Sequence, residues 1–158
     1  MKNLLLFCFF VFGTCPILMA QELGDSRLHA LGQYGLRLEE PGIGLGWEYF
    51  FAPQFGLMPS YTQLFPSVGR SSNFSTDLRY YLSKEKSQVY VLAGYSLTSE
   101  NSQPGTAGTK RNLSGANVGV GAVVPLTNWV GLSSEFKFQS QGFQQTYFRF
   151  GLEFPLGK

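Results

Sequence analysis

The sequence has few of the residues on which small exported proteins and metalloproteins usually depend. It contains two cysteines, Cys8 and Cys15, and one histidine, His29. Both cysteines lie within an expected signal peptide, so the mature chain would have no disulfide framework. One histidine and scattered acids do not provide the clustered ligands of a metal site. We therefore expect neither a metal nor a cofactor.

An excess of one charge and long apolar runs are missing as well. Apart from Lys2, eleven basic residues stand against ten acidic ones, without a basic stripe, so we expect no nucleic-acid partner. Beyond the N-terminal twenty residues, no segment is long and apolar enough for a transmembrane helix, which needs roughly 20 residues. If the protein enters a membrane, it must do so as strands.

Residues 1–20 have the pattern of a secretory signal peptide. One lysine precedes an apolar stretch, Leu4–Phe12, which is followed by small and turn-forming residues and then by Leu18-Met19-Ala20. This order is typical of a signal that is cleaved after Ala20. We expect the mature chain, 21–158, to form one domain. The alternative is a lipoprotein signal that is lipidated at Cys15, but the residues before that cysteine fit such a signal poorly.

The mature sequence alternates between apolar and polar residues with a period of two, which is typical of strands with two unlike faces. Eight segments are expected as strands: 28–38, 43–51, 55–64, 73–82, 88–98, 115–124, 130–139 and 145–154. Every second connection is a tight turn, whereas the others include longer, polar segments such as 99–112. Short turns at one end and longer loops at the other favour an all-β, eight-stranded antiparallel up-and-down barrel that crosses the outer membrane.

The two faces of the expected strands differ sharply, as the stretch 145–154 shows. Its even-numbered residues from Phe148 to Phe154 are apolar, whereas the residues between them include Arg149 and Glu153. Aromatic residues expected on the apolar faces are Trp47, Tyr49, Tyr80, Phe136, Phe148, Phe150 and Phe154. The polar faces carry four basic and four acidic residues, namely Arg37, Arg79, Lys137, Arg149, Glu48, Asp77, Glu135 and Glu153. The equal numbers of basic and acidic residues are explained if these residues form ion pairs inside a closed barrel. A face exposed to water could also carry equal numbers of both.

The glycines decide which face is inside. Seven of them fall on the polar faces: Gly44, Gly46, Gly94, Gly119, Gly121, Gly131 and Gly151. A solvated face has no need of small residues, and glycine weakens strands. An eight-stranded barrel is just wide enough for side chains, so its interior does need them. We therefore place the polar network in the lumen and the aromatic face in lipid. Burial of the aromatic face in a soluble, lipocalin-like periplasmic binder is the alternative.

The signal peptide, the eight alternating strands and the aromatic closing strand are similar to those of the small eight-stranded outer-membrane β-barrel proteins of Gram-negative bacteria, often labelled porin-like. The resemblance covers Leu23–Leu156. It implies an outer-membrane location, contact with outer-membrane lipids, and insertion by the barrel-assembly machinery, which reads a terminal aromatic residue. Here Phe154 is followed by four further residues, so that recognition element is shifted or modified. A second departure is Pro59, which predicts a bulge or a short third strand.

Catalysis is not expected. His29, Ser75 and Asp77 could form an acyltransferase group, but nothing in the sequence places them together, and polar residues filling a lumen are the simpler interpretation. The loop 99–112 could bind a surface partner, although its composition is also that of a solvated loop. We expect a structural or surface-interaction role. The alternative to that role is a narrow porin-like channel for small solutes.

Overall fold

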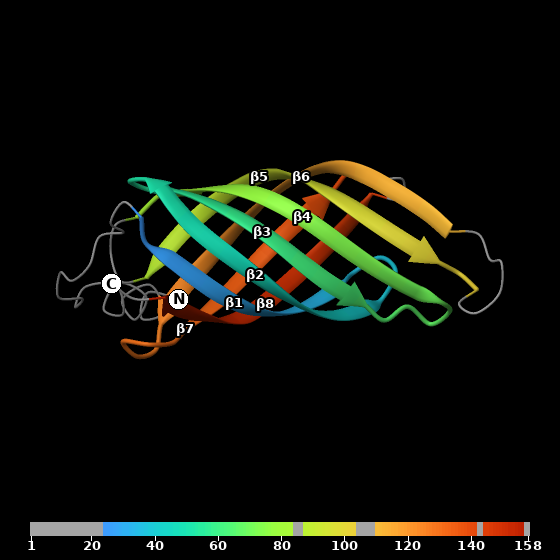
Figure 1. The fold of residues 1–158 in the computed structure, drawn as a ribbon, viewed down its shortest axis with the longest axis horizontal. Coiled ribbons are helices and arrows are strands. Elements are labelled where there is room, and N and C mark those ends of the chain that lie inside the picture. Colours follow the sequence, from blue (N-terminus) through green and yellow to red (C-terminus); the bar gives the residue numbers. More distant parts are fainter. Residues whose placement is uncertain (1–23, 84–86, 104–109, 142–143, 157–158) are drawn as a thin grey trace, which may run out of the picture.

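The computed structural model describes residues 24–83, 87–103, 110–141 and 144–156, which form a closed antiparallel barrel. Its strands are β1 (Ser26–Gly35), β2 (Glu40–Ala52), β3 (Phe55–Leu64), β4 (Arg70–Tyr81), β5 (Gln88–Asn101), β6 (Lys110–Pro125), β7 (Gly131–Gln139) and β8 (Gln145–Leu156). Each strand pairs with its neighbours in chain order, and β1 pairs with β8 to close the ring (Figure 1). The predicted eight-stranded up-and-down barrel is confirmed. Among the described residues, no helix is long and apolar enough to cross a membrane.

The barrel has two unlike ends. The start of β1 and the end of β8 lie together, with Ser26 opposite Leu156. The β2–β3, β4–β5 and β6–β7 connections share this end, which we call the turn end. The other four connections form the loop end, on the right of Figure 1. A closed ring of this kind leaves no strand edge unpaired.

Side chains alternate between a charged, buried inner face and an apolar, exposed outer face. On β8, Arg149 is 1% exposed whereas its neighbour Phe150 is 53% exposed. The expected outer aromatic residues lie on the outer face, where Trp47, Tyr49, Tyr80, Phe136, Phe148 and Phe150 are exposed and Phe154 is half-buried. Relative to a soluble barrel, this arrangement is inside-out.

Three expectations about strand ends and irregularities are wrong. β1 ends at Gly35 instead of residue 38, because the chain turns over the next four residues with a positive φ at Glu39. The expected loop 99–112 is shorter, because β5 and β6 stay paired out to Asn101 and Lys110, and its residues 104–109 lie outside the described part of the chain. β3 has its full ten residues despite Pro59, and the register shift in the β2–β3 pair lies near the turn.

The turn-end half of the interior is packed with large side chains. A buried cluster of Phe50, Tyr81, Tyr90, Leu92 and Val123 occupies it. The rings of Phe50 and Tyr81 lie 5.3 Å apart, and those of Tyr81 and Tyr90 lie 5.1 Å apart. Three aromatic rings in contact across β2, β4 and β5 leave little space for a passage at this level of the barrel.

Inner-face glycines make room for this packing. Gly94 stands directly opposite Asp77 in the β4–β5 pair. A Cβ at Gly94 would lie 2.8 Å from the Cα of Asp77 and would also meet the carbonyl oxygen of Thr76. Backbone atoms in a closed barrel cannot move away, so this position requires glycine.

We expect Gly94→Ala to lower the free energy of unfolding by about 1–3 kcal/mol, because the added methyl group overpacks the contact between β4 and β5. Gly131→Ala is the matched control, since a Cβ there would meet no atom closer than 3.5 Å. Urea unfolding of the refolded protein in detergent micelles measures both. Equal effects of the two substitutions would contradict the packing argument.

Candidate functional site: the charged interior and the loop-end mouth

The middle of the lumen holds a chain of charged side chains whose signs alternate. Arg79 lies between two acids, with Nη1 3.3 Å from Glu48 Oε2 and Nη2 2.7 Å from Glu135 Oε2. Arg149 Nη1 continues the chain, 3.4 Å from Glu135 Oε1 and 3.9 Å from Asp77 Oδ2. These side chains come from β2, β4, β7 and β8, so the chain of ion pairs crosses the barrel from wall to wall.

Lys137 ends this chain on β7. Its Nζ lies 2.7 Å from Asp77 Oδ2 and donates to Ser75 Oγ at 3.1 Å. The second oxygen of Asp77 accepts a hydrogen bond from Asn117 Nδ2 at 2.8 Å. Both carboxylate oxygens are therefore satisfied, as the burial of a charge requires.

Tyrosines from the turn-end cluster also bind the acids. Tyr81 donates its hydroxyl to Glu48 Oε1 at 2.7 Å, and Tyr90 donates to Glu135 Oε2 at 3.0 Å. The guanidinium carbon of Arg79 lies 4.5 Å from the centre of the Tyr90 ring, within cation–π range. Aromatic packing and ion pairing are thus one connected structure.

Two side chains of β1 join the network. His29 Nε2 lies 3.1 Å from Glu48 Oε2, and Arg27 Nη1 lies 3.1 Å from Glu153 Oε1. Arg27 also lies over the ring of Phe50, with its guanidinium carbon 4.7 Å from the ring centre. Sequence reasoning missed Arg27, because the first strand was expected to start at Leu28. Continuing the alternation by one residue toward the N-terminus would have found it.

The structure brings seven of the eight expected lumen residues into the interior, and Arg37 is the exception. Because β1 ends at Gly35, Arg37 lies in the following turn, where it is exposed and its Nη1 is 3.4 Å from the carbonyl oxygen of Gln144. Assigning it to the lumen was wrong. With Arg27 in its place, the interior network of the described residues again has four basic and four acidic groups.

The possible catalytic group is not assembled. Ser75 Oγ lies 3.3 Å from Asp77 Oδ2, but His29 contacts Glu48 instead of either residue. Within the described residues, no three histidine, cysteine or acidic side chains are grouped as metal ligands. The geometry therefore gives no nucleophile, base and orienting acid in contact with one another.

Neutral polar side chains line the loop-end half of the lumen, and not all of them are paired. Asn73 Nδ2 donates to Thr98 Oγ1 at 2.6 Å, and Ser96 Oγ donates to Asn117 Oδ1 at 2.8 Å. The Oγ of Ser71 and both amide atoms of Gln145 are buried without a protein partner. Ion pairs therefore dominate the middle of the barrel and neutral polar side chains the loop end, and buried atoms without a protein partner occur in both parts, as at Arg79 Nε and Arg149 Nη2.

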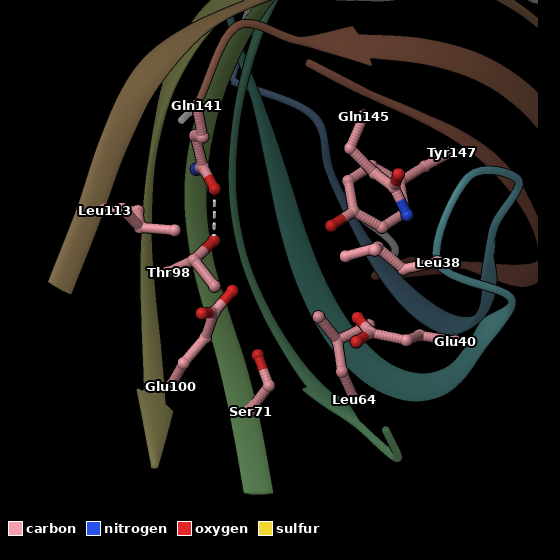
Figure 2. Close-up of a pocket in the computed structure, with 10 residues that line it drawn as sticks. All are labelled: Leu38, Glu40, Leu64, Ser71, Thr98, Glu100, Leu113, Gln141, Gln145 and Tyr147. Atoms are coloured by element: carbon pink, nitrogen blue, oxygen red, sulfur yellow. Dashed lines mark hydrogen bonds between the residues drawn. The ribbon is translucent and has the colours of Figure 1, made fainter. Parts of the chain in front are cut away.

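Two small adjoining cavities lie at this mouth. The inner one, of about 20 Å³, has mixed walls in which three leucines, Leu38, Leu64 and Leu113, stand beside the polar residues Glu40, Ser71, Thr98, Glu100, Gln141, Gln145 and Tyr147 (Figure 2). The outer one, of about 140 Å³, shares Glu40, Ser71 and Glu100 with it and adds Arg70. Apart from Glu100, which lies in the segment 99–112, sequence reasoning did not single out these residues, since they lie toward strand ends, where alternation gives its weakest signal.

An eight-stranded closed barrel with a charged interior and an apolar exterior is the architecture of the small outer-membrane barrels. The N-terminal β-barrel domain of Pseudomonas aeruginosa OprF matches with a TM-score of 0.76 and 18% identity, over 86% of this chain and 100% of that one. Neisserial surface protein A, NspA, matches with a TM-score of 0.63 and 11% identity, over 82% of this chain and 94% of its own.

The Yersinia pestis attachment invasion locus protein, Ail, matches with a TM-score of 0.57 and 14% identity, over 85% of this chain and 100% of that one. No protein-family model matches the chain, and no curated protein matches it. At these identities, the likeness establishes the fold. The resemblance to small outer-membrane barrels is confirmed at that level.

We expect Arg79→Met to lower the free energy of unfolding by about 3–5 kcal/mol, because it leaves the buried carboxylates of Glu48 and Glu135 without their shared cation. Arg37→Met is the matched control and should change stability little, since Arg37 is exposed. Urea unfolding in detergent micelles, followed by tryptophan fluorescence, compares them. A larger loss from the Arg37 variant would contradict the assignment of Arg79 to the network.

Proposed function

We propose that this chain is an outer-membrane β-barrel protein with a side-chain-filled lumen and a structural or surface-interaction role without catalysis. The observation that carries the proposal is the inversion of the barrel's two faces. Charged residues such as Arg79 and Lys137 are buried, while large apolar residues such as Ile43 and Leu45 are more than 60% exposed. Only a lipid environment makes both placements favourable.

The dimensions and the backbone support the same proposal. The strands have between 9 residues, in β7, and 16 residues, in β6, and a transmembrane strand needs roughly 9–11. The closed ring pairs every strand on both sides, as the bilayer interior requires. A soluble lipocalin-like binder would need an apolar interior, whereas this interior is dominated by ion pairs.

A closed lumen supports a structural role better than a channel. The ion pairs from Glu48 to Lys137 cross the barrel, and the rings of Phe50, Tyr81 and Tyr90 fill the turn-end half. A solute would have to separate oppositely charged buried groups in order to pass. Separating them costs several kcal/mol for each broken pair, roughly 3–5 by the usual effect of removing one partner.

A surface-interaction role would use the loop end. Two structural neighbours are named as a surface protein and as an attachment invasion locus protein. These names support a similar kind of role here, with the segment 99–112, which covers the end of β5, the connection and the start of β6, as the proposed contact for a surface partner. Outer-membrane lipids would contact the outer aromatic face. The barrel-assembly machinery would insert the chain, guided by the aromatic outer face of β8.

Cell fractionation and gel mobility test the membrane location. We expect the protein in the detergent-extracted outer-membrane fraction, with a mobility that changes between unboiled and boiled samples because the closed barrel resists the detergent. Recovery from the periplasm without detergent, and no change in mobility on boiling, would support the soluble binder instead.

Conductance in planar bilayers tests the closed lumen separately. We expect the refolded protein to give no steady single-channel current, because the ion pairs and aromatic rings fill the cross-section. A steady current that changes when Arg149 is replaced by methionine would contradict the closed lumen and support the narrow channel.

A further inference from the structure

Strand β6 extends past its neighbour β7 at the loop end. β5 pairs with β6 from Lys110 onward, whereas β7 pairs with it only from Asn117 to Pro125. Figure 1 shows β6 reaching farther toward the loop end than the arrowhead of β7. Residues 110–116 therefore project beyond the part of the ring in which β6 has a neighbour on both sides. Among the described strands, β5 alone runs beside this projecting segment along its whole length.

Ser140 ends the pairing between β6 and β7. Its backbone N–H donates to the carbonyl oxygen of Ala116 at 3.0 Å, and its Oγ accepts from the N–H of Ala116 at 2.9 Å. The chain then turns into the lumen, where Gln141 is buried and binds Ser96 and Thr98 of β5. The residue that would continue the β7 ladder is thus directed inward, away from the side of β6.

The side of β6 that β7 leaves uncovered carries backbone hydrogen-bonding groups. Within a strand, the N–H and C=O of one residue point to the same side, and those of the next residue point to the other side. Since the N–H and C=O of Ala116 point toward β7, those of Ser114 and Asn112 point the same way. In the described part of the chain, neither residue forms a backbone hydrogen bond on that side. These groups form a short open edge, which we call the β6 edge (110–114).

The β6 edge lies beyond the apolar band of the outer face. Phe74 of β4 and Leu97 of β5 stand opposite each other, and both are exposed on the outer face. Toward the loop end, the next two outward rows across β4, β5 and β6 are polar: Ser72, Ser99 and Asn112, then Arg70, Asn101 and Lys110. The bilayer interior does not tolerate unpaired backbone groups. An edge outside the apolar band meets that condition and is accessible to another chain from the water.

A second copy of this chain does not fit the edge. Strands of membrane barrels tilt by roughly 35–45° from the membrane normal. Two copies inserted in the same direction, related by a two-fold axis along the normal, would therefore cross their β6 edges at roughly 70–90°. Paired strands run nearly parallel or antiparallel, so these two edges cannot pair. An extended segment of a different protein that approaches from outside the membrane has no such constraint.

The side chains beside the edge indicate the composition of the partner. On the outer face, Arg70 and Lys110 bring two positive charges to one row, with Asn101 between them. On the inner face, Leu113 is half-buried and lines the inner cavity. A strand added to the edge places its alternate side chains on these two faces. Acidic residues suit the outer face and apolar residues suit the inner face.

We propose that the β6 edge binds an extended segment of a partner protein by strand addition, and that this segment alternates acidic and apolar residues. The backbones of Asn112 and Ser114 supply the hydrogen bonds, while Lys110 and Leu113 select the side chains. The inference rests on the surface-interaction role proposed above and names the kind of partner for it.

A short, fluorescently labelled peptide of alternating glutamate and valine tests the edge on the refolded full barrel in detergent micelles. We expect its fluorescence anisotropy to rise saturably as barrel is added. The same peptide with lysine in place of glutamate is the matched control. It should bind at least about tenfold more weakly, because it brings like charges to Arg70 and Lys110.

Asn112→Pro separates pairing at the edge from folding of the barrel. Proline removes the N–H that points to the open side, and an edge position of this kind accepts proline. We expect the variant to keep the gel mobility of the folded barrel and to lose binding of the glutamate peptide. Asn112→Thr is the matched control, since threonine keeps the N–H and suits a strand, and it should bind the peptide as the unchanged protein does.

Lys110→Glu gives a second test at an exposed side chain. We expect the charge reversal to weaken binding of the glutamate peptide and to strengthen binding of the lysine peptide, because the outer row then carries one charge of each sign.

The proposal is overturned if the folded barrel does not bind the glutamate peptide, or if the Asn112→Pro variant binds it as well as the Asn112→Thr variant does. Dimers of the barrel that Asn112→Pro abolishes would also overturn it, because a second copy would then be the partner. The fractionation and gel-mobility experiment decides the membrane location separately. A barrel that is found in the outer membrane and does not bind the peptide therefore contradicts the strand addition alone.

Discussion

The position of Arg79 between Glu48 and Glu135 is the interaction on which the rest of the barrel depends. Its two contacts, at 3.3 and 2.7 Å, join β2 and β4 to β7 through the middle of the lumen. A buried charge is tolerated only when its partners are in place, so this residue fixes both acids. The acids in turn fix the hydroxyls of Tyr81 and Tyr90, which fill the turn-end half. The closed interior is therefore a consequence of charge pairing as much as of packing.

Filling the lumen with charge has consequences for the outer wall and for the mouth. Because the polar side chains lie in the interior, the outer face is apolar. The apolar side chains must therefore be shielded from water by what surrounds the barrel, since they do not form its core. Toward the loop end, the ion pairs give way to neutral polar side chains such as Ser71 and Gln145. The two small cavities described above lie at this end of the lumen.

The alternation of the sequence predicted the eight strands and their two faces, because a period of two follows directly from strand geometry. Glycines such as Gly94, opposite Asp77, settled which face is inside. Strand ends were predicted less well. Arg37 was placed in the lumen because alternation does not show that the chain turns after Gly35, and Arg27 was missed because the first strand was expected to start at Leu28, two residues late. The partners of Arg79 and the mouth cavity could not be predicted, since contacts across a barrel depend on register and stagger that no local pattern contains.

The orientation of the two faces is the central claim, and Trp47 tests it most directly. The chain has two tryptophans, and Trp129→Phe leaves Trp47, on the outer face of β2, as the sole tryptophan, which can be excited apart from the tyrosines. In lipid bilayers, the account predicts that brominated acyl chains quench Trp47 strongly and that aqueous iodide does not. Quenching by iodide without quenching by brominated chains would contradict it, because the aromatic face would then lie in water.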